Sequence, residues 1–191
     1  SKELPWPGAR CGWMEFYNRN SDADFNRLCD VLDDAKMIEV CSTTLPQKAI
    51  PLLLGHPEYP EYRKELNDRT GERSKLISSL LEDLPQITFN ETFGAFYNTI
   101  VLKKGVLKKG RQRFISNPEI KALVGGWTSG DMALDKVFVY NLLGAKGVCV
   151  VPLSSFHSEL EGFRVTLLEE DEEILRKTFT LIREGIKEFC V

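Results

Sequence analysis

Apolar residues recur at intervals of three and four positions in several segments of the chain, a spacing that predicts amphipathic helices. The clearest stripe lies in residues 169–189, where five large apolar side chains fall on one face: Leu175, Phe179, Ile182, Ile186 and Phe189. Acidic residues fill the first turn of this segment, as the helix dipole favours. The sequence therefore predicts a closing helix that buries one side of its surface.

Other segments show the same period with weaker stripes. Residues 22–39 follow a Ser21-Asp22 pair, which is typical of a helix N-cap. Further helices are predicted for a segment with Pro46 in its first turn, for a long charged stretch over residues 60–84, for a short segment after Asn117-Pro118, and for a segment that opens at Gly130-Asp131.

Strand-like patterns occupy the gaps between these helices. Residues 13–17 alternate in a way that predicts a short strand, and residues 87–101, 148–151 and 163–168 also favour strands. Helices and strands thus follow one another without a regular βαβ repeat. This order predicts an α/β (α+β) domain, in which a mixed or antiparallel sheet has helices packed on one side.

Composition excludes several classes of partner. The 191 residues are 42% hydrophobic and 28% charged with a formal net charge of −3, which is typical of a globular protein and gives no overall basis for nucleic-acid binding. A basic cluster at residues 103–113 favours a solvated hairpin or loop. Nucleic-acid binding is the alternative, but no aromatic residues are interleaved for stacking. No apolar run is long enough to span a membrane, so we expect neither partner.

Cysteine and histidine usage narrows the chemistry further. The five cysteines show no CxxC spacing, which predicts free thiols in a reducing compartment and hence a cytoplasmic protein. The only histidines are His56 and His157, so we expect no metal site.

The first thirteen residues place a lysine and an arginine in a short loop with several turn formers. Lys2 is followed by Pro7-Gly8, Arg10 and Gly12-Trp13. A lysine that forms a Schiff base needs a neutral amine, which a neighbouring positive charge favours. A guanidinium supplies that charge and can also bind a phosphate through two hydrogen bonds. Taken alone, Lys2 would more simply be an exposed residue at a chain start.

The spacing of these residues resembles that of the class I/II (fold type I) pyridoxal-phosphate-dependent aminotransferases. The resemblance implies that Lys2 is the catalytic base and forms the Schiff base with pyridoxal 5'-phosphate. It also implies that Arg10 binds the phosphate of this cofactor.

A second resemblance lies in the C-terminal half. Residues 147–156 are similar to the family's strand and Pro-Gly-Ser-x-Phe turn, although Leu153 replaces the glycine. Gly162-Phe163-Arg164 resembles the segment that carries the arginine for the substrate α-carboxylate. A planar guanidinium suits this role because two parallel hydrogen bonds orient a carboxylate. The alternative for Arg164 is a surface position on an edge strand.

Together these motifs extend over nearly the whole chain but over only the later half of a typical family member. The resemblance implies that residues 1–44 are a remnant of the large cofactor-binding domain, and that residues 45–191 form the interdomain helix and small C-terminal domain. It predicts a fragment of a homodimeric aminotransferase that moves an amino group from an amino acid to a 2-oxo acid and is inactive as this truncated chain. The alternatives are a lyase or decarboxylase on the same scaffold, or a non-catalytic interaction fragment.

Overall fold

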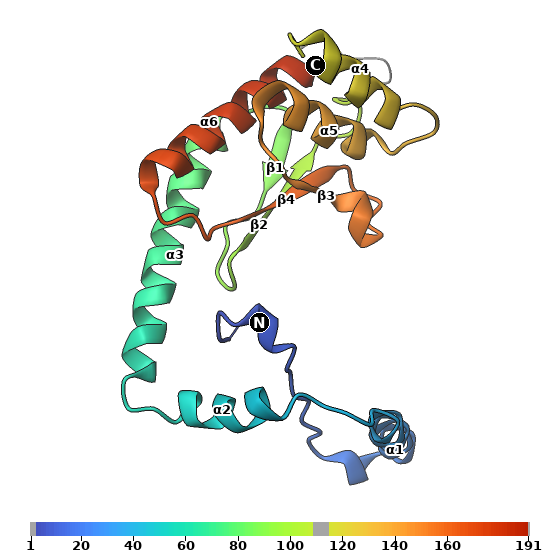
Figure 1. Cartoon of the computed structure of the whole chain (residues 1–191), viewed down its shortest axis with the longest axis vertical. Helices are drawn as coiled ribbons and strands as arrows, with labels where there is room; N and C mark the ends of the chain where they lie inside the picture. The colour runs from blue at the N-terminus through green and yellow to red at the C-terminus, as the bar shows by residue number, and fades with distance from the viewer. Residues whose placement is uncertain (1–2, 109–114, 191) are drawn as a thin grey trace. The chain divides into compact units, whose positions relative to one another are not determined.

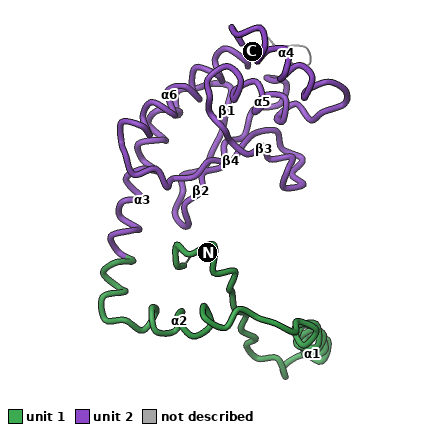
Figure 2. Tube along the Cα trace, viewed as in Figure 1, with its two compact units in different colours: residues 1–63 green, residues 64–191 purple. Residues whose placement is uncertain are grey.

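The computed structural model describes residues 3–108 and 115–190 (Figure 1). The chain divides into two compact units, residues 1–63 and residues 64–191, which are described separately (Figure 2). The long helix α3 (Tyr59–Leu81) runs across this division and confirms the predicted charged helix. The resemblance also implies a boundary between residues 44 and 45, where the remnant of the large domain would end. A division into compact units does not test this origin, so the boundary stays a prediction.

The first unit is built from helices and loops. Besides the start of α3, its elements are η1 (Pro7–Ala9), η2 (Arg19–Ser21), α1 (Ala23–Met37) and α2 (Thr44–Leu54). Helix α1 begins where the Asp22 carboxylate accepts a hydrogen bond of 2.7 Å from the backbone N–H of Phe25. This is the N-cap that the sequence predicted. Pro46 lies in the first turn of α2, as also predicted.

The strand predicted at residues 13–17 is wrong. This segment has no regular secondary structure, and Trp13, Met14 and Tyr17 are exposed. A strand is stabilised by hydrogen bonds to a neighbouring strand, and the described part of the first unit contains no strand with which it could pair. Alternation of apolar and polar residues alone therefore does not produce a strand here.

The second unit contains a sheet of four antiparallel strands. They are β1 (Ile87–Phe89), β2 (Tyr97–Leu102), β3 (Val151–Pro152) and β4 (Gly162–Thr166), arranged in the order β1-β2-β4-β3. In the central pair, Thr99 lies opposite Arg164 and Ile100 lies opposite Phe163. The antiparallel form of the predicted sheet is thus confirmed.

One face of this sheet is covered by helices. Ile100, Phe163 and Val165 are buried in a single apolar cluster with residues of α3, α5 (Leu134–Lys146) and α6 (Glu172–Phe189) (Figure 1). On the opposite face, Thr99 and Thr166 are exposed. The short helix α4 (Pro118–Trp127) packs against α5, where Val124 reaches the backbone of Gly144. This arrangement confirms the prediction of helices packed on one side.

The closing helix is the best-predicted element. The Asp171 side chain caps α6, and the five predicted stripe residues are all at most 5% exposed: Leu175, Phe179, Ile182, Ile186 and Phe189. They contribute to the main core, in which the ring of Phe138 on α5 stacks on that of Phe163 with their centroids 5.6 Å apart.

Two other predicted segments differ in extent. Of the strand predicted at residues 148–151, only Val151 pairs with β4, together with Pro152 just beyond it. Val148 and Val150 are nevertheless buried in alternation with exposed Cys149. In the basic cluster, Lys103, Lys104 and Lys108 are exposed in a turn after β2. The rest of the cluster, residues 109–113, lies outside the described residues.

Candidate functional site

Arg164 lies in the middle of β4, next to the centre of the sheet. Its neighbours along the strand, Phe163 and Val165, point into the core, so the alternation of a strand directs Arg164 to the opposite face of the sheet. Gly162 permits this register, because a Cβ at that position would collide with the backbone carbonyl of Ile100. The sequence therefore places a guanidinium on the sheet face opposite the main core.

Two aromatic rings flank this guanidinium. Its central carbon lies 4.2 Å from the ring centroid of Tyr97 on β2 and 4.1 Å from that of Phe156. Both distances are well within the range of cation–π attraction. Arg164 is half-buried, and a guanidinium can bind a planar anion such as a carboxylate through two parallel hydrogen bonds.

Phe156 reaches Arg164 from a short 3-10 helix, η3 (Leu153–Phe156). The Leu153 that replaces the family's glycine is buried in the core and begins this helix. Next to it, the backbone N–H and the hydroxyl of Ser154 donate hydrogen bonds of 2.8 and 2.6 Å to the two carboxylate oxygens of Asp135 on α5. Asp135 itself is only 1% exposed.

The sequence alone did not identify Tyr97, Phe156 and Asp135 as residues that surround or support Arg164. Phe156 belongs to the resembling segment at 147–156, and Tyr97, the first residue of β2, lies inside the strand region predicted at residues 87–101. Neither position carried a sequence signal of contact with Arg164. Asp135 gave no signal beyond an acidic residue in the first turn of a helix.

Arg10 lies in the first unit, at the end of η1. Its backbone is left-handed, with φ 47° and ψ 39°, and its side-chain N–H donates a long hydrogen bond of 3.4 Å to the carbonyl of Pro7. The side chain is exposed, and no carboxylate among the described residues forms an ion pair with it. Its guanidinium is therefore accessible to an anion.

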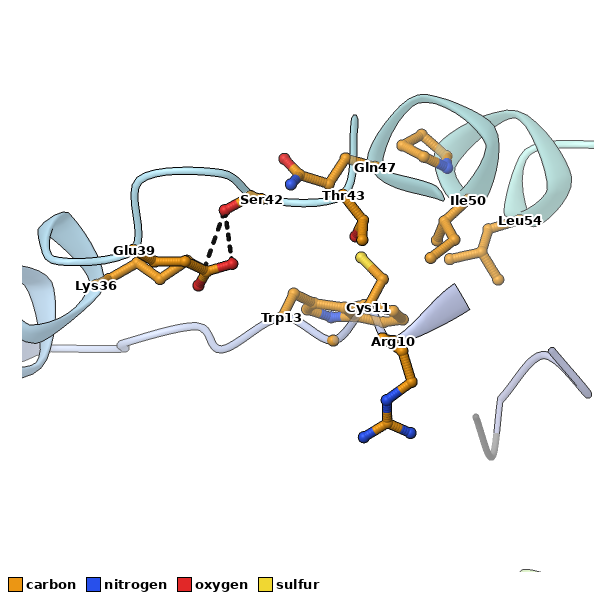
Figure 3. Close-up of a pocket in the computed structure, with 12 residues that line it drawn as sticks. Arg10, Cys11, Trp13, Lys36, Glu39, Ser42, Thr43, Gln47, Ile50 and Leu54 are labelled. Atoms are coloured by element: carbon orange, nitrogen blue, oxygen red, sulfur yellow. Dashed lines mark hydrogen bonds and ion pairs between the residues drawn. The ribbon is translucent and has the colours of Figure 1, made fainter. Parts of the chain in front are cut away.

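A pocket of about 580 Å³ opens beside Arg10 (Figure 3). Its lining is partly polar, from Glu39 and Ser42, and partly apolar, from Trp13 and Ile50. Figure 3 shows that the Arg10 guanidinium points away from Cys11, which faces Thr43 and Ile50. Arg10 contributes to the lining of the pocket, but its guanidinium and the Cys11 side chain extend in opposite directions from the segment.

Lys2 lies outside the described residues, and its neighbour Glu3 is the first residue that the structure describes. The Glu3 carboxylate accepts a hydrogen bond of 2.7 Å from the Tyr59 hydroxyl and lies 3.4 Å from the Arg63 guanidinium. Burial and the interaction with Glu3 raise the pKa of Tyr59. The segment that follows Lys2 is therefore attached to the first turns of α3.

The structure describes two of the three predicted site residues, and these two lie in different units. Arg10 belongs to the first unit and Arg164 to the second, and the roles of Lys2, Arg10 and Arg164 stay predictions. Among the described residues, no group of three or more His, Cys, Asp or Glu side chains could hold a metal ion. None of the described helices is long and apolar enough to cross a membrane.

Comparison with curated proteins gives two aminotransferases. The chain is 46% identical to an uncharacterized aminotransferase of Methanocaldococcus jannaschii over 189 residues, which are 99% of this chain and 44% of that protein. It is 27% identical to an alanine aminotransferase 2-like protein of Danio rerio, over 87% of this chain and 29% of that protein. The chain thus spans less than half the length of these relatives. No family model matches it.

Solved structures with a similar fold are also aminotransferases. An alanine aminotransferase from Pyrococcus furiosus superposes with a TM-score of 0.62 and 23% identity, over 88% of this chain and 36% of that one. An aspartate aminotransferase from Rhizobium meliloti gives 0.56 and 21%, over 87% and 36%. Sequence and fold together confirm that this chain resembles a part of the aminotransferases along nearly its whole length.

Proposed function

We propose that this chain is the part of a pyridoxal-phosphate-dependent, fold type I aminotransferase that supplies the cofactor-linked lysine and two anion-binding arginines. The observation that carries the proposal is the setting of Arg164, whose guanidinium is flanked by Tyr97 and Phe156 on the sheet face opposite the core. An arginine that served only as a surface residue would not need two aromatic neighbours. The 46% identity to an aminotransferase along the chain supports the same conclusion.

Arg164 would bind the α-carboxylate of the amino-acid or 2-oxo-acid substrate. Two parallel hydrogen bonds from its N–H groups would fix the orientation of the carboxylate. Orientation matters because the Cα bond that is broken must align with the π system of the cofactor. The aromatic neighbours would limit the guanidinium to few orientations and so reduce the entropy lost on binding.

Arg10 and Lys2 would serve the cofactor. Arg10 fits a phosphate because its guanidinium is exposed and lacks a carboxylate partner in the described part of the chain. Lys2 would bond to the cofactor through Nζ and would move a proton to and from the substrate Cα. Pyridoxal phosphate, when bound, serves as the electron sink and carries the amino group between the two substrates.

The complete reaction would need more cofactor-binding groups than these 191 residues supply. Since the chain spans 44% of one relative and 29% of the other, the remaining cofactor contacts would come from outside these 191 residues. We therefore propose that the 191-residue chain alone does not turn over amino acids. The complete enzyme would be a cytoplasmic homodimer.

Reductive trapping tests the role of Lys2. The chain is incubated with pyridoxal 5'-phosphate, reduced with borohydride and digested, and the modified peptides are mapped by mass spectrometry. We expect Lys2 to be labelled ahead of exposed lysines such as Lys48 and Lys121, and the map must separate Lys2 from the α-amine of Ser1. Labelling spread evenly over the exposed lysines would contradict the proposal.

A further inference from the structure

The contact between Phe156 and Arg164 depends on how η3 is held. This helix has only four residues, and Phe156 is its last one, 43% exposed and followed by His157 in the left-handed conformation. A single 3-10 turn is only marginally stable by itself. Contacts elsewhere must therefore fix the place of the Phe156 ring.

One such contact is the burial of Leu153 at the first position of η3. An apolar side chain in a core fixes position but constrains rotation of the following turn only weakly. The second contact is polar and directional. The Asp135 carboxylate accepts from both the backbone N–H and the hydroxyl of Ser154, so the pair fixes the orientation of η3 as well as its position.

The location of Asp135 explains how a buried carboxylate is tolerated. Burial of a charge is costly unless hydrogen bonds compensate it. Asp135 lies in the first turn of α5, where the helix dipole favours negative charge. Its oxygens also satisfy a backbone N–H in the first turn of η3, which has no partner within that helix. The carboxylate thus bridges the starts of two helices.

We propose that Asp135 is a positioning residue for the carboxylate-binding arginine. Asp135 holds Ser154, Ser154 fixes η3, and η3 places the Phe156 ring against the guanidinium of Arg164, 4.1 Å away. Asp135 does not touch the guanidinium and acts only through this chain of contacts. The part of the inference that concerns substrate rests on the function proposed for Arg164.

The spectroscopic test uses the chain labelled with ¹⁵N-arginine. The side-chain Nε–Hε signal of Arg164 is assigned as the one lost in Arg164→Lys. Ring currents from the flanking aromatic rings displace this signal, and Phe156→Leu defines its position when one ring is removed. We expect Ser154→Ala and Asp135→Asn to move the signal toward the Phe156→Leu position. Ser154→Thr, which keeps the hydroxyl, should restore the position of the wild type.

Ser155→Ala is the matched control, because Ser155 is an exposed serine on the same turn. It should leave the Arg164 signal in place. The inference is overturned if Ser154→Ala leaves the signal unmoved while Phe156→Leu shifts it, or if Phe156→Leu itself has no effect. If Asp135→Asn unfolds the protein, so that the whole spectrum loses its dispersion, the result for Ser154→Ala alone tests the inference.

A titration with pyruvate separates this inference from the proposed function. We expect the Arg164 signal to shift saturably with pyruvate but not with the neutral analogue pyruvamide, and Ser154→Ala to weaken the affinity about three- to tenfold. If the wild type does not respond to pyruvate, the role of Arg164 in substrate binding is contradicted. The ligand-free shifts then still test the positioning by Asp135.

Discussion

Arg183 and Asp83 form a bidentate ion pair between α6 and the turn that follows α3. Both terminal nitrogens of Arg183 donate to the carboxylate, one to each oxygen, and one nitrogen also donates to the carbonyl of Leu80 at 2.7 Å. A bidentate pair fixes the relative orientation of the two side chains better than a single hydrogen bond does. It attaches the closing helix to the long helix at a second point beyond the apolar core.

The Arg183–Asp83 ion pair predicts how the stability of the protein changes at acid pH. The hydrogen bonds from Arg183 lower the pKa of Asp83 below its usual value of 3.8. A carboxyl with a depressed folded-state pKa contributes stability that is present above its unfolded pKa and is lost as pH falls through the folded pKa. Asp83→Asn should therefore lower the urea midpoint near neutral pH, and the difference from wild type should shrink below about pH 4. Glu82→Gln changes a neighbouring exposed residue and should show no such trend. A difference in urea midpoint between Asp83→Asn and the wild type that does not change with pH would contradict the prediction.

The second prediction concerns the buried stripe of α6. Leu175 and Phe179 are each 2% exposed, whereas Ile174 on the same helix is 50% exposed. Truncation of a buried side chain removes apolar burial and leaves a cavity, so Leu175→Ala or Phe179→Ala should cost about 2–5 kcal/mol of unfolding free energy. Ile174→Ala is the control and should cost far less. Equal losses for all three variants in a denaturant melt would show that α6 is not packed in this way.

Alkaline titration tests the attachment of the N-terminal segment to α3. The pKa of Tyr59 is raised by burial and by its hydrogen bond to Glu3. A group with a raised folded-state pKa contributes stability that is present below its unfolded pKa, about 10 for tyrosine, and is lost as pH rises through the folded pKa. We expect the tyrosinate absorbance that Tyr59→Phe removes to develop above about pH 10. Glu3→Gln should move that component to lower pH, and an unchanged titration in Glu3→Gln would refute the contact.

Local patterns predicted the elements whose stabilising contacts lie nearby in sequence or in one continuous stripe. The α6 stripe and the Asp22 cap of α1 are of this kind, since spacing or a single hydrogen bond defines them. The strand expected at residues 13–17 depends on a partner strand, which no local pattern reveals. For the same reason, the pattern could not show that Leu28 and Val31 on α1 would remain exposed.

The candidate site divides in a similar way. Arg10 and Arg164 were found through motifs with fixed spacing, because each motif is a continuous loop or strand. The aromatic setting of Arg164 joins β4 and the neighbouring η3 to β2, which lies far from both in the chain. The bond from Asp135 to Ser154 spans 19 positions and involves residue types that are common in any surface helix or turn. Only the folded arrangement shows that these residues act on one guanidinium.

A comparison of pyridoxal 5'-phosphate with pyridoxal tests most directly whether Arg10 supplies the phosphate contact of an aminotransferase cofactor. Both aldehydes are titrated by absorbance against the wild type, Arg10→Gln and the control Arg27→Gln, which alters an exposed arginine on α1. We predict that the wild type and Arg27→Gln bind the phosphorylated form more tightly by about tenfold. Arg10→Gln should lose that preference. Equal affinities of the wild type for the two aldehydes, or a preference unchanged in Arg10→Gln, would contradict this role of Arg10.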